Sequence, residues 1–192
     1  MWVRKKTLGL RHRIVRLIAP TLYTTSIAGS DILPRPAIVA VKSVMGSTSL
    51  VGAEIGTAFG VHAESILKTL NIKKLYLIDP YEVYLQDGVL LDWAPKAKAE
   101  AVRRLEHFGG RIQFVNLTSD EAVTVVPDGL DFVYIDGNHD YEHVKNDIQN
   151  YYLKVRDGGV VGGHDFSTDN FGVMCAVLEF CKPEFRRLNL QA

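Results

Sequence analysis

The chain has 192 residues, of which 47% are hydrophobic and 23% charged, a length and composition typical of one globular domain with its own core. These values exclude a collagen and a chain that is disordered throughout, and no apolar run approaches the ~20 residues that a membrane helix needs. The two cysteines, Cys175 and Cys181, lie on different faces of one expected helix, so the sequence does not indicate a disulfide-stabilised secreted scaffold.

The charges are unevenly distributed along the chain. The formal net charge is zero, but the first 30 residues contain six Lys and Arg and no acid, which leaves 16 basic and 22 acidic residues in the rest. An acidic body argues against nucleic acid as a partner, because non-specific affinity comes from neutralising phosphates. We expect residues 1–36 to form a basic helical arm that is solvated or contacts a second copy, with contact to a membrane surface as the alternative. The arm does not resemble a secretory signal, and we expect a cytoplasmic protein.

From residue 37 onward the sequence predicts helices and strands in alternation, beginning with a helix over 37–45. Five short apolar runs are strand-like, and each is followed by helical periodicity; they cover 49–56, 74–80, 111–117, 130–136 and 158–166. Thr118 and Glu121 have capping-box spacing at the start of the third of the helices that follow. Residues 81–94 hold three large aromatic side chains without a clean period. They predict an ordered loop or short helices that either pack on the core or wall a substrate site.

Five strand–helix units in succession indicate a parallel sheet with helices on both faces. The expected fold class is α/β, a Rossmann-like, doubly wound and mainly parallel sheet formed by residues 37–192. Residues 185–192 resemble the start of a sixth strand that stops at Ala192. We therefore expect a sheet that is short at its C-terminal edge, either naturally or because the sequence is trimmed. An uncovered edge invites a partner strand, which favours a homodimer.

Glycines and an acid follow the first two strands, at the edge where open parallel sheets bind their ligands. Gly56 and Gly60, in the run EIGTAFG, permit a tight turn and a close backbone approach. Their spacing is not G-x-G-x-x-G, which disfavours a nicotinamide-dependent oxidoreductase. Asp79 ends the second strand, where a carboxylate can accept hydrogen bonds from both hydroxyls of a ribose. Together these residues indicate a site for a nucleoside-containing ligand.

On these residues the chain resembles the class I S-adenosylmethionine-dependent methyltransferases, over roughly residues 45–182. In that family the first motif, which here reads VGAEIGTAFG, surrounds the methionine part of the cofactor, and the acid that matches Asp79 holds the ribose. Positions that match Thr118 and Ser119 contact adenine, although the family often has an aspartate where Thr118 stands. The resemblance implies a set of cofactor-binding residues: Glu54, Gly56, Thr57, Ala58, Gly60, Asp79, Thr118, Ser119 and Asp136.

The later runs DFVYIDGNHDYEHVKNDI and GGVVGGHDF resemble a narrower group. This group comprises small-molecule O-methyltransferases that act on sugars of macrolides and related natural products, together with cephalosporin-hydroxylase-like proteins. In those relatives a divalent metal, magnesium or manganese, lies between an aspartate after the fourth strand and an acidic pair after the fifth. The resemblance implies Asp136, His164 and Asp165 as the metal ligands here, and His139 as the catalytic general base.

His164 replaces what is usually a carboxylate in that group. Magnesium prefers oxygen ligands, so an imidazole favours manganese, iron or zinc and leaves a site without metal open. From the residues alone, Asp136, Asp165 and an imidazole at adjacent strand ends are costly to bury unless a cation or a charged substrate accompanies them. A metal would lower the pKa of a chelated hydroxyl, and His139 would remove its proton.

The sequence therefore predicts an enzyme that methylates a hydroxyl of a small molecule with S-adenosylmethionine as cofactor. The alternative is a cofactor-binding or interaction protein that retains the methyltransferase fold without turnover. His62 follows the glycine run directly, and it either faces the cofactor or is a solvated residue of the first helical turn.

Overall fold

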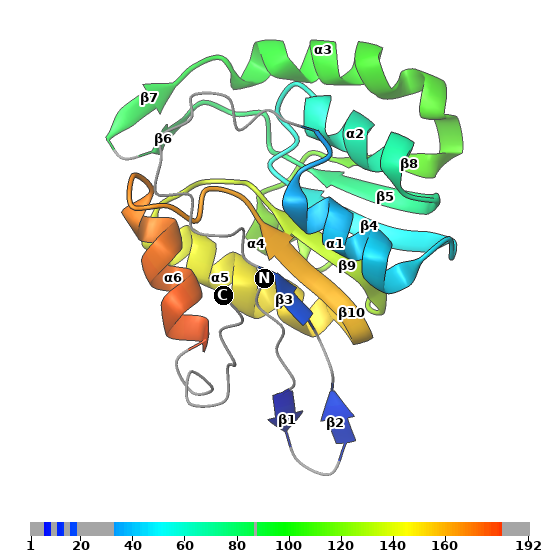
Figure 1. Cartoon of the computed structure of the whole chain (residues 1–192). Coiled ribbons are helices and arrows are strands. Elements are labelled where there is room, and N and C mark those ends of the chain that lie inside the picture. The colour runs from blue at the N-terminus through cyan, green and yellow to red at the C-terminus, as the bar shows by residue number, and fades with distance from the viewer. Residues whose placement is uncertain (1–5, 9–10, 14–15, 19–32, 87, 182–192) are drawn as a thin grey trace.

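The computed structural model describes residues 6–8, 11–13, 16–18, 33–86 and 88–181. Its centre is a six-stranded sheet with the order β3-β10-β9-β4-β5-β8, in which every neighbouring pair is parallel (Figure 1). The strands are β3 (Arg16–Ile18), β4 (Leu50–Ile55), β5 (Ile72–Ile78), β8 (Ile112–Val115), β9 (Leu130–Ile135) and β10 (Val155–Gly163). From β4 the chain moves outward to β5 and β8 and then returns to β9 and β10 on the other side of β4. The predicted doubly wound α/β fold is confirmed, with its switch point between β4 and β9.

Helices cover both faces of the sheet (Figure 1). One face carries α1 (Pro36–Met45), α2 (Val61–Thr69) and α3 (Ala94–Leu105), which continues into a 3₁₀ turn over Glu106–Arg111; the other carries α4 (Ser119–Ala122), α5 (Tyr141–Lys154) and α6 (Phe171–Cys181). In β9, Phe132 and Tyr134 pack on the α1 and α2 side, whereas Val133 and Ile135 pack on the α5 side. Successive side chains of a strand point to opposite faces, so a strand covered on both faces is apolar throughout. Among the described residues, no helix is both long and apolar enough to span a membrane.

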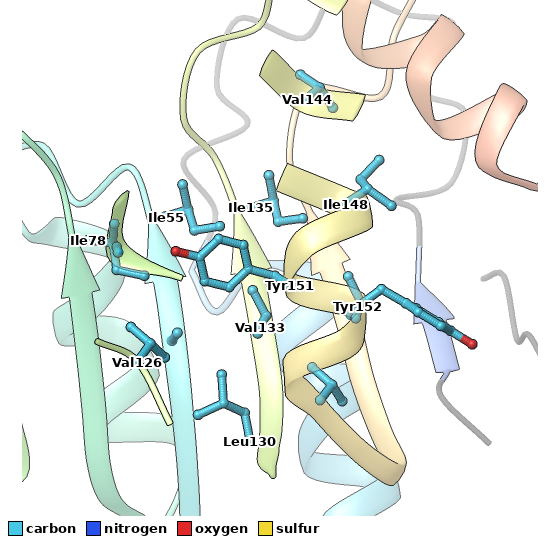
Figure 2. Close-up of a cluster of buried hydrophobic side chains, with 14 of the residues drawn as sticks. Ile55, Ile78, Val126, Leu130, Val133, Ile135, Val144, Ile148, Tyr151 and Tyr152 are labelled. Atoms are coloured by element: carbon cyan, nitrogen blue, oxygen red, sulfur yellow. The ribbon is translucent and has the colours of Figure 1, made fainter. Parts of the chain in front are cut away.

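The layer beneath α5 supports the strand ends that carry the site. Figure 2 shows Ile55 and Ile135 of the sheet beside Ile148 and Tyr151 of α5. Tyr151 is fully buried, and its hydroxyl donates a hydrogen bond to the Ser119 carbonyl at 2.8 Å. Burial of one such side chain contributes about 1.5–3 kcal/mol. The ends of β4 and β9 therefore rest on a well-packed support.

Outside residues 81–94, the elements predicted between residues 37 and 181 are confirmed in kind and order, and the capping box is present. Thr118 Oγ1 accepts a hydrogen bond from the Glu121 amide at 3.3 Å, and the Glu121 carboxylate accepts one from the Thr118 amide at 3.0 Å. Residues 81–94 differ from the expectation, because β6 (Tyr84–Gln86) and β7 (Val89–Leu91) form an antiparallel hairpin. The sequence held the signal for it. An Asp-Gly pair at 87–88 is typical of a two-residue hairpin turn, and Gly88 has a φ of 74°.

The expectation of a helical arm over 1–36 is wrong for the described part of that segment. β1 (Lys6–Leu8) and β2 (Arg11–Arg13) form an antiparallel pair, and β3 joins the main sheet parallel to β10. The physical reason is that β10 would otherwise present a row of unpaired backbone groups at the sheet edge. Because β3 covers this edge, the paired stretch has no open position for a strand from a partner. The homodimer stays a prediction. The strand expected over 185–192 lies outside the described residues.

Candidate functional site

The turn between β4 and α2 packs directly against the end of β9. Gly56 has a φ of 83°, and a Cβ on it would overlap the Asp136 carbonyl oxygen and lie 2.9 Å from Gly137 Cα. Gly60 precedes α2 with a φ of 74°, and a Cβ there would lie 2.9 Å from the Leu105 side chain. Only glycine combines a positive φ with so close an approach. The turn lies at the switch point of the sheet, where the sequence predicted it.

Asp79, at the end of β5, ties this turn to the next loop. Its two carboxylate oxygens accept hydrogen bonds from the Ala58 and Tyr81 amides, each at 2.8 Å. Burial raises the pKa of the Asp79 carboxyl, and the backbone amides, including that of Thr57, act in the opposite direction. Ala58 and Tyr81 have φ values of 46° and 54°, conformations that cost about 1–3 kcal/mol each without such support. A carboxylate offers about four lone-pair sites, so Asp79 keeps capacity for ligand hydroxyls.

Glu54 and His62 form a buried pair directly beneath the glycine turn. His62 Nδ1 lies 2.7 Å from Glu54 Oε1, and the two residues are 7% and 1% exposed. Burial raises the pKa of Glu54 to about 8, against the lowering effect of the Arg35 charge. Burial also lowers the pKa of His62 to about 3. Burial therefore disfavours the charged form of each member of the pair. The solvated alternative for His62 is wrong, because its ring packs against Tyr134 at 4.1 Å between centroids.

Buried polar atoms without a hydrogen-bond partner gather around this turn. In the part of the chain that the structure describes, they include Arg35 Nε, Glu54 Oε2, Thr57 Oγ1, His62 Nε2 and Tyr81 OH. Buried polar groups in proteins are almost always hydrogen-bonded, and an unmade bond costs about 1–3 kcal/mol. A polar molecule bound over the ends of β4 and β5 would supply these missing bonds.

The ends of β9 and β10 bring two carboxylates and two imidazoles together. His139 Nε2 and His164 Nδ1 each lie 3.0 Å from Asp165 Oδ2, and His164 Nδ1 lies 3.7 Å from Asp136 Oδ1. Burial raises the pKa of Asp136. For Asp165, burial acts in the same direction, but hydrogen bonds from His139 and His164 hold the pKa well below its usual range. The backbone of Asp165 has a φ of 55°, a strained conformation of the kind that clusters at functional sites.

Three of these residues could hold a metal ion. One donor atom each from Asp136, His139 and Asp165 lie within 4.8 Å of one another. The sequence grouped the same two carboxylates with His164 and kept His139 apart as a base. The structure brings both imidazoles to Asp165, so its geometry offers His139 for either task.

Sequence reasoning missed Arg35, which lies just before α1. Its Nη1 forms an ion pair with Asp136 Oδ2 and donates a hydrogen bond to the Tyr134 hydroxyl at 3.2 Å. A partly buried arginine 101 residues away from its acidic partner has no local signal. The sequence offers only the run Pro-Arg-Pro ahead of a predicted helix.

The remaining predicted positions lie at the far side of the row of strand ends. Thr118 and Ser119 follow β8, and the Thr118 hydroxyl is occupied by the capping box, donating to the Glu121 carboxylate at 2.8 Å.

The aromatic residues of 81–94 lie in different surroundings. Tyr81 is buried beside α3, and Trp93 stacks on Phe59 of the glycine turn with ring centroids 5.4 Å apart. Trp93 therefore covers the turn.

An apolar pocket opens beside the cluster of His139, His164 and the two aspartates. Its walls come from α5, α6 and the end of β10, including Val144, Val161 and Val173, and its polar side is formed by Asp136, His139 and His164. A few polar groups converging on an apolar cavity are typical of small-molecule sites.

The fold and the site define a class of protein: an open α/β domain whose candidate site lies across the ends of its central strands, where such domains bind their ligands. A family described as "methyltransferase domain" matches residues 53–166, more than half of the chain. The chain therefore belongs to the methyltransferase domain family, and S-adenosylmethionine is the cofactor that membership implies.

The chain is also similar to a viral protein and to several solved structures. An uncharacterized protein of Acanthamoeba polyphaga mimivirus is 33% identical over 122 residues, which span 61% of this chain but only 52% of the viral protein. Precorrin-6y C5,15-methyltransferase from Geobacter metallireducens shares the fold with a TM-score of 0.57 and 16% identity, over 86% of this chain and 75% of that one. An rRNA methylase from Streptococcus thermophilus matches with a TM-score of 0.55 and 16% identity, over 82% and 84%. At such identities the two structures show the fold alone.

Proposed function

We propose that the protein transfers a methyl group from S-adenosylmethionine to a hydroxyl of a small molecule. The observation that carries the proposal is the hydrogen bond between His139 and Asp165, 3.0 Å long, at the strand ends that adjoin the glycine turn. It joins a base and a carboxylate that orients it, next to an apolar pocket of small-molecule type.

The residues around the turn fit the cofactor. Asp79 offers acceptor capacity for ribose hydroxyls, and the unpartnered Glu54 and Thr57 oxygens lie where the family's first motif surrounds the methionine part. Gly56 leaves no room for a side chain because the end of β9 fills that space, so the turn is held directly against the strand end that carries Asp136. When bound, the cofactor supplies a methyl group on a positively charged sulfonium. The protein's main contribution is then alignment, because holding a nucleophile in line with that carbon supplies most of the rate.

His139 would take the proton from the acceptor hydroxyl. Asp165, which stays ionised because of its two imidazole partners, stabilises the imidazolium that forms and fixes the orientation of the ring. The apolar pocket would exclude water from the reacting hydroxyl and hold the body of the acceptor.

A divalent metal fits the donor set and is part of the proposal. Asp136 and Asp165 would hold it together with an imidazole, and such mixed oxygen and nitrogen ligands suit manganese, iron or zinc better than magnesium. A metal there would lower the pKa of the acceptor hydroxyl. The ion pair with Arg35 takes Asp136 Oδ2, so Oδ1, which faces His164, is the oxygen that remains for a metal.

Calorimetry with S-adenosylhomocysteine, followed by transfer of labelled methyl from S-adenosylmethionine to a panel of hydroxyl compounds, tests the proposal. His139→Ala should lower turnover about 10²–10⁴-fold and leave S-adenosylhomocysteine affinity within a few fold. His107→Ala, at an exposed histidine of the 3₁₀ turn, is the matched control and should change neither. Absence of binding by either form of the cofactor at millimolar concentration would overturn the proposal. Binding without transfer to any acceptor would instead indicate a cofactor-binding protein that has kept the fold.

A further inference from the structure

Arg35 reaches the site from outside the segment that the methyltransferase family matches, which begins at residue 53. It precedes α1, yet its guanidinium contacts Asp136 and Tyr134 at the end of β9. The side chain is 14% exposed, and the guanidinium carbon lies 5.9 Å from the centroid of the Tyr134 ring. A permanent positive charge is thus fixed beside the glycine turn.

The guanidinium is only partly satisfied by these contacts. An arginine carries five N–H donors in a rigid fork that matches a carboxylate in two-point geometry. Both described contacts come from Nη1, and the buried Nε has no hydrogen-bond partner among the described residues. Holding a buried donor without a partner is unfavourable. The arginine therefore has capacity for a further anionic acceptor.

A buried oxygen nearby lacks a hydrogen-bond donor, whereas Arg35 lacks an acceptor. Glu54 Oε2, on a side chain that is 1% exposed, also has no partner in the part of the chain that is described. The Arg35 charge is close enough to act on both Glu54 and His62. The end of β4 and the end of β9 thus offer an acceptor for an ammonium group and a donor fork for a carboxylate, which are the two halves of an α-amino acid.

Strand order decides which end of the cofactor reaches Arg35. The sheet runs β9-β4-β5 at this point, with Arg35 and Asp136 at β9, the glycine turn at β4 and Asp79 at β5. A cofactor with its ribose on Asp79 and its methionine part over the turn would direct its amino acid end toward β9. Resting on the proposed function, we infer that Arg35 binds the carboxylate of S-adenosylmethionine. It would give up part of its contact with Asp136 in exchange.

Ligands that differ in the amino acid end test this assignment by calorimetry. S-adenosylhomocysteine carries both groups, its decarboxylated analogue keeps the ammonium, and 5′-methylthioadenosine lacks both. Arg35→Met should weaken S-adenosylhomocysteine by about 10- to 100-fold, the range for hydrogen bonds to a charged group, and leave the two truncated ligands within two- to threefold. Arg35→Lys should restore part of the loss, because it returns the charge without the fork. Arg156→Met removes a more exposed arginine–aspartate pair, with Asp131 at the opposite end of the sheet, and should change no affinity.

A merely structural Arg35 would give a different pattern. Equal weakening of all three ligands by Arg35→Met, or no weakening of S-adenosylhomocysteine, would overturn the assignment. If Arg35→Met does not fold, as judged by circular dichroism, the affinities of the native protein for the three ligands still test the assignment. It should bind the decarboxylated analogue about 10- to 100-fold more weakly than S-adenosylhomocysteine, and equal affinities would refute the role. A native protein that binds none of these ligands would refute the proposed function itself, whereas native binding without an Arg35 effect would refute only this inference.

Discussion

Replacing Gly56 with alanine should destabilise the protein more than a glycine-to-alanine change at any other loop that the structure describes. The positive φ of 83° costs an alanine about 1–3 kcal/mol, and the new Cβ would overlap the Asp136 carbonyl oxygen. Relief of that overlap requires a shift of the β9 end, and overpacking of this kind adds about 1–3 kcal/mol. We expect a total loss of about 2–6 kcal/mol in the free energy of unfolding, together with loss of S-adenosylhomocysteine binding.

Two other glycines separate the two causes. Gly46 has a φ of 62° with no atom within 4 Å of an added Cβ, so Gly46→Ala measures backbone strain alone, about 1–3 kcal/mol. Gly110 has neither a positive φ nor a neighbour, so Gly110→Ala should be close to neutral. Urea unfolding of the three variants gives the comparison. A Gly56→Ala variant no less stable than Gly46→Ala would refute the argument that the turn is packed against β9.

Three further predictions concern charged groups of the site. Burial raises the pKa of Glu54 from an ordinary 4.5 to about 8, so its stabilising effect is present below pH 4.5 and is lost as the pH rises toward 8. Glu54→Gln should therefore gain stability relative to the native chain across that window in urea unfolding, and a constant difference would contradict the burial argument. Asp79→Ala should weaken S-adenosylhomocysteine by about 1.5–3 kcal/mol in calorimetry, while manganese affinity stays unchanged. Asp165→Asn should abolish manganese binding, measured by electron paramagnetic resonance, with S-adenosylhomocysteine affinity within a few fold; native-like manganese binding by this variant would exclude the metal site.

Much of the site could be predicted, because the residues that follow parallel strands all lie at the same edge of the sheet. The residues after each strand are neighbours in sequence to an apolar run that identifies the strand, so Gly56, Asp79, Asp136 and Asp165 could be assigned to a common edge without coordinates. The capping box of Thr118 was equally local. The hairpin at 84–91 was not predicted, although the Asp-Gly pair at 87–88 is a local signal for a hairpin turn.

Contacts across long sequence separations could not be predicted in the same way. The burial of His62, on α2, depends on Tyr134 of β9, and the Arg35 ion pair depends on a residue 101 positions away. The position of β3 beside β10 likewise reflects which sheet edge is open once the other strands have paired. None of these contacts leaves a periodicity in the sequence.

The sequence by itself determined the alternation of elements, the parallel sheet and the strand ends at which the site lies, because hydrophobic period, glycine and capping preferences act over a few residues. Tertiary structure alone decided how the site is charged. Burial disfavours charge on Glu54 and His62, two imidazoles favour the ionised form of Asp165, and a distant Arg35 pairs with Asp136. The physical reason is that desolvation and Coulomb interactions depend on distances through space, which the order of residues along the chain does not specify.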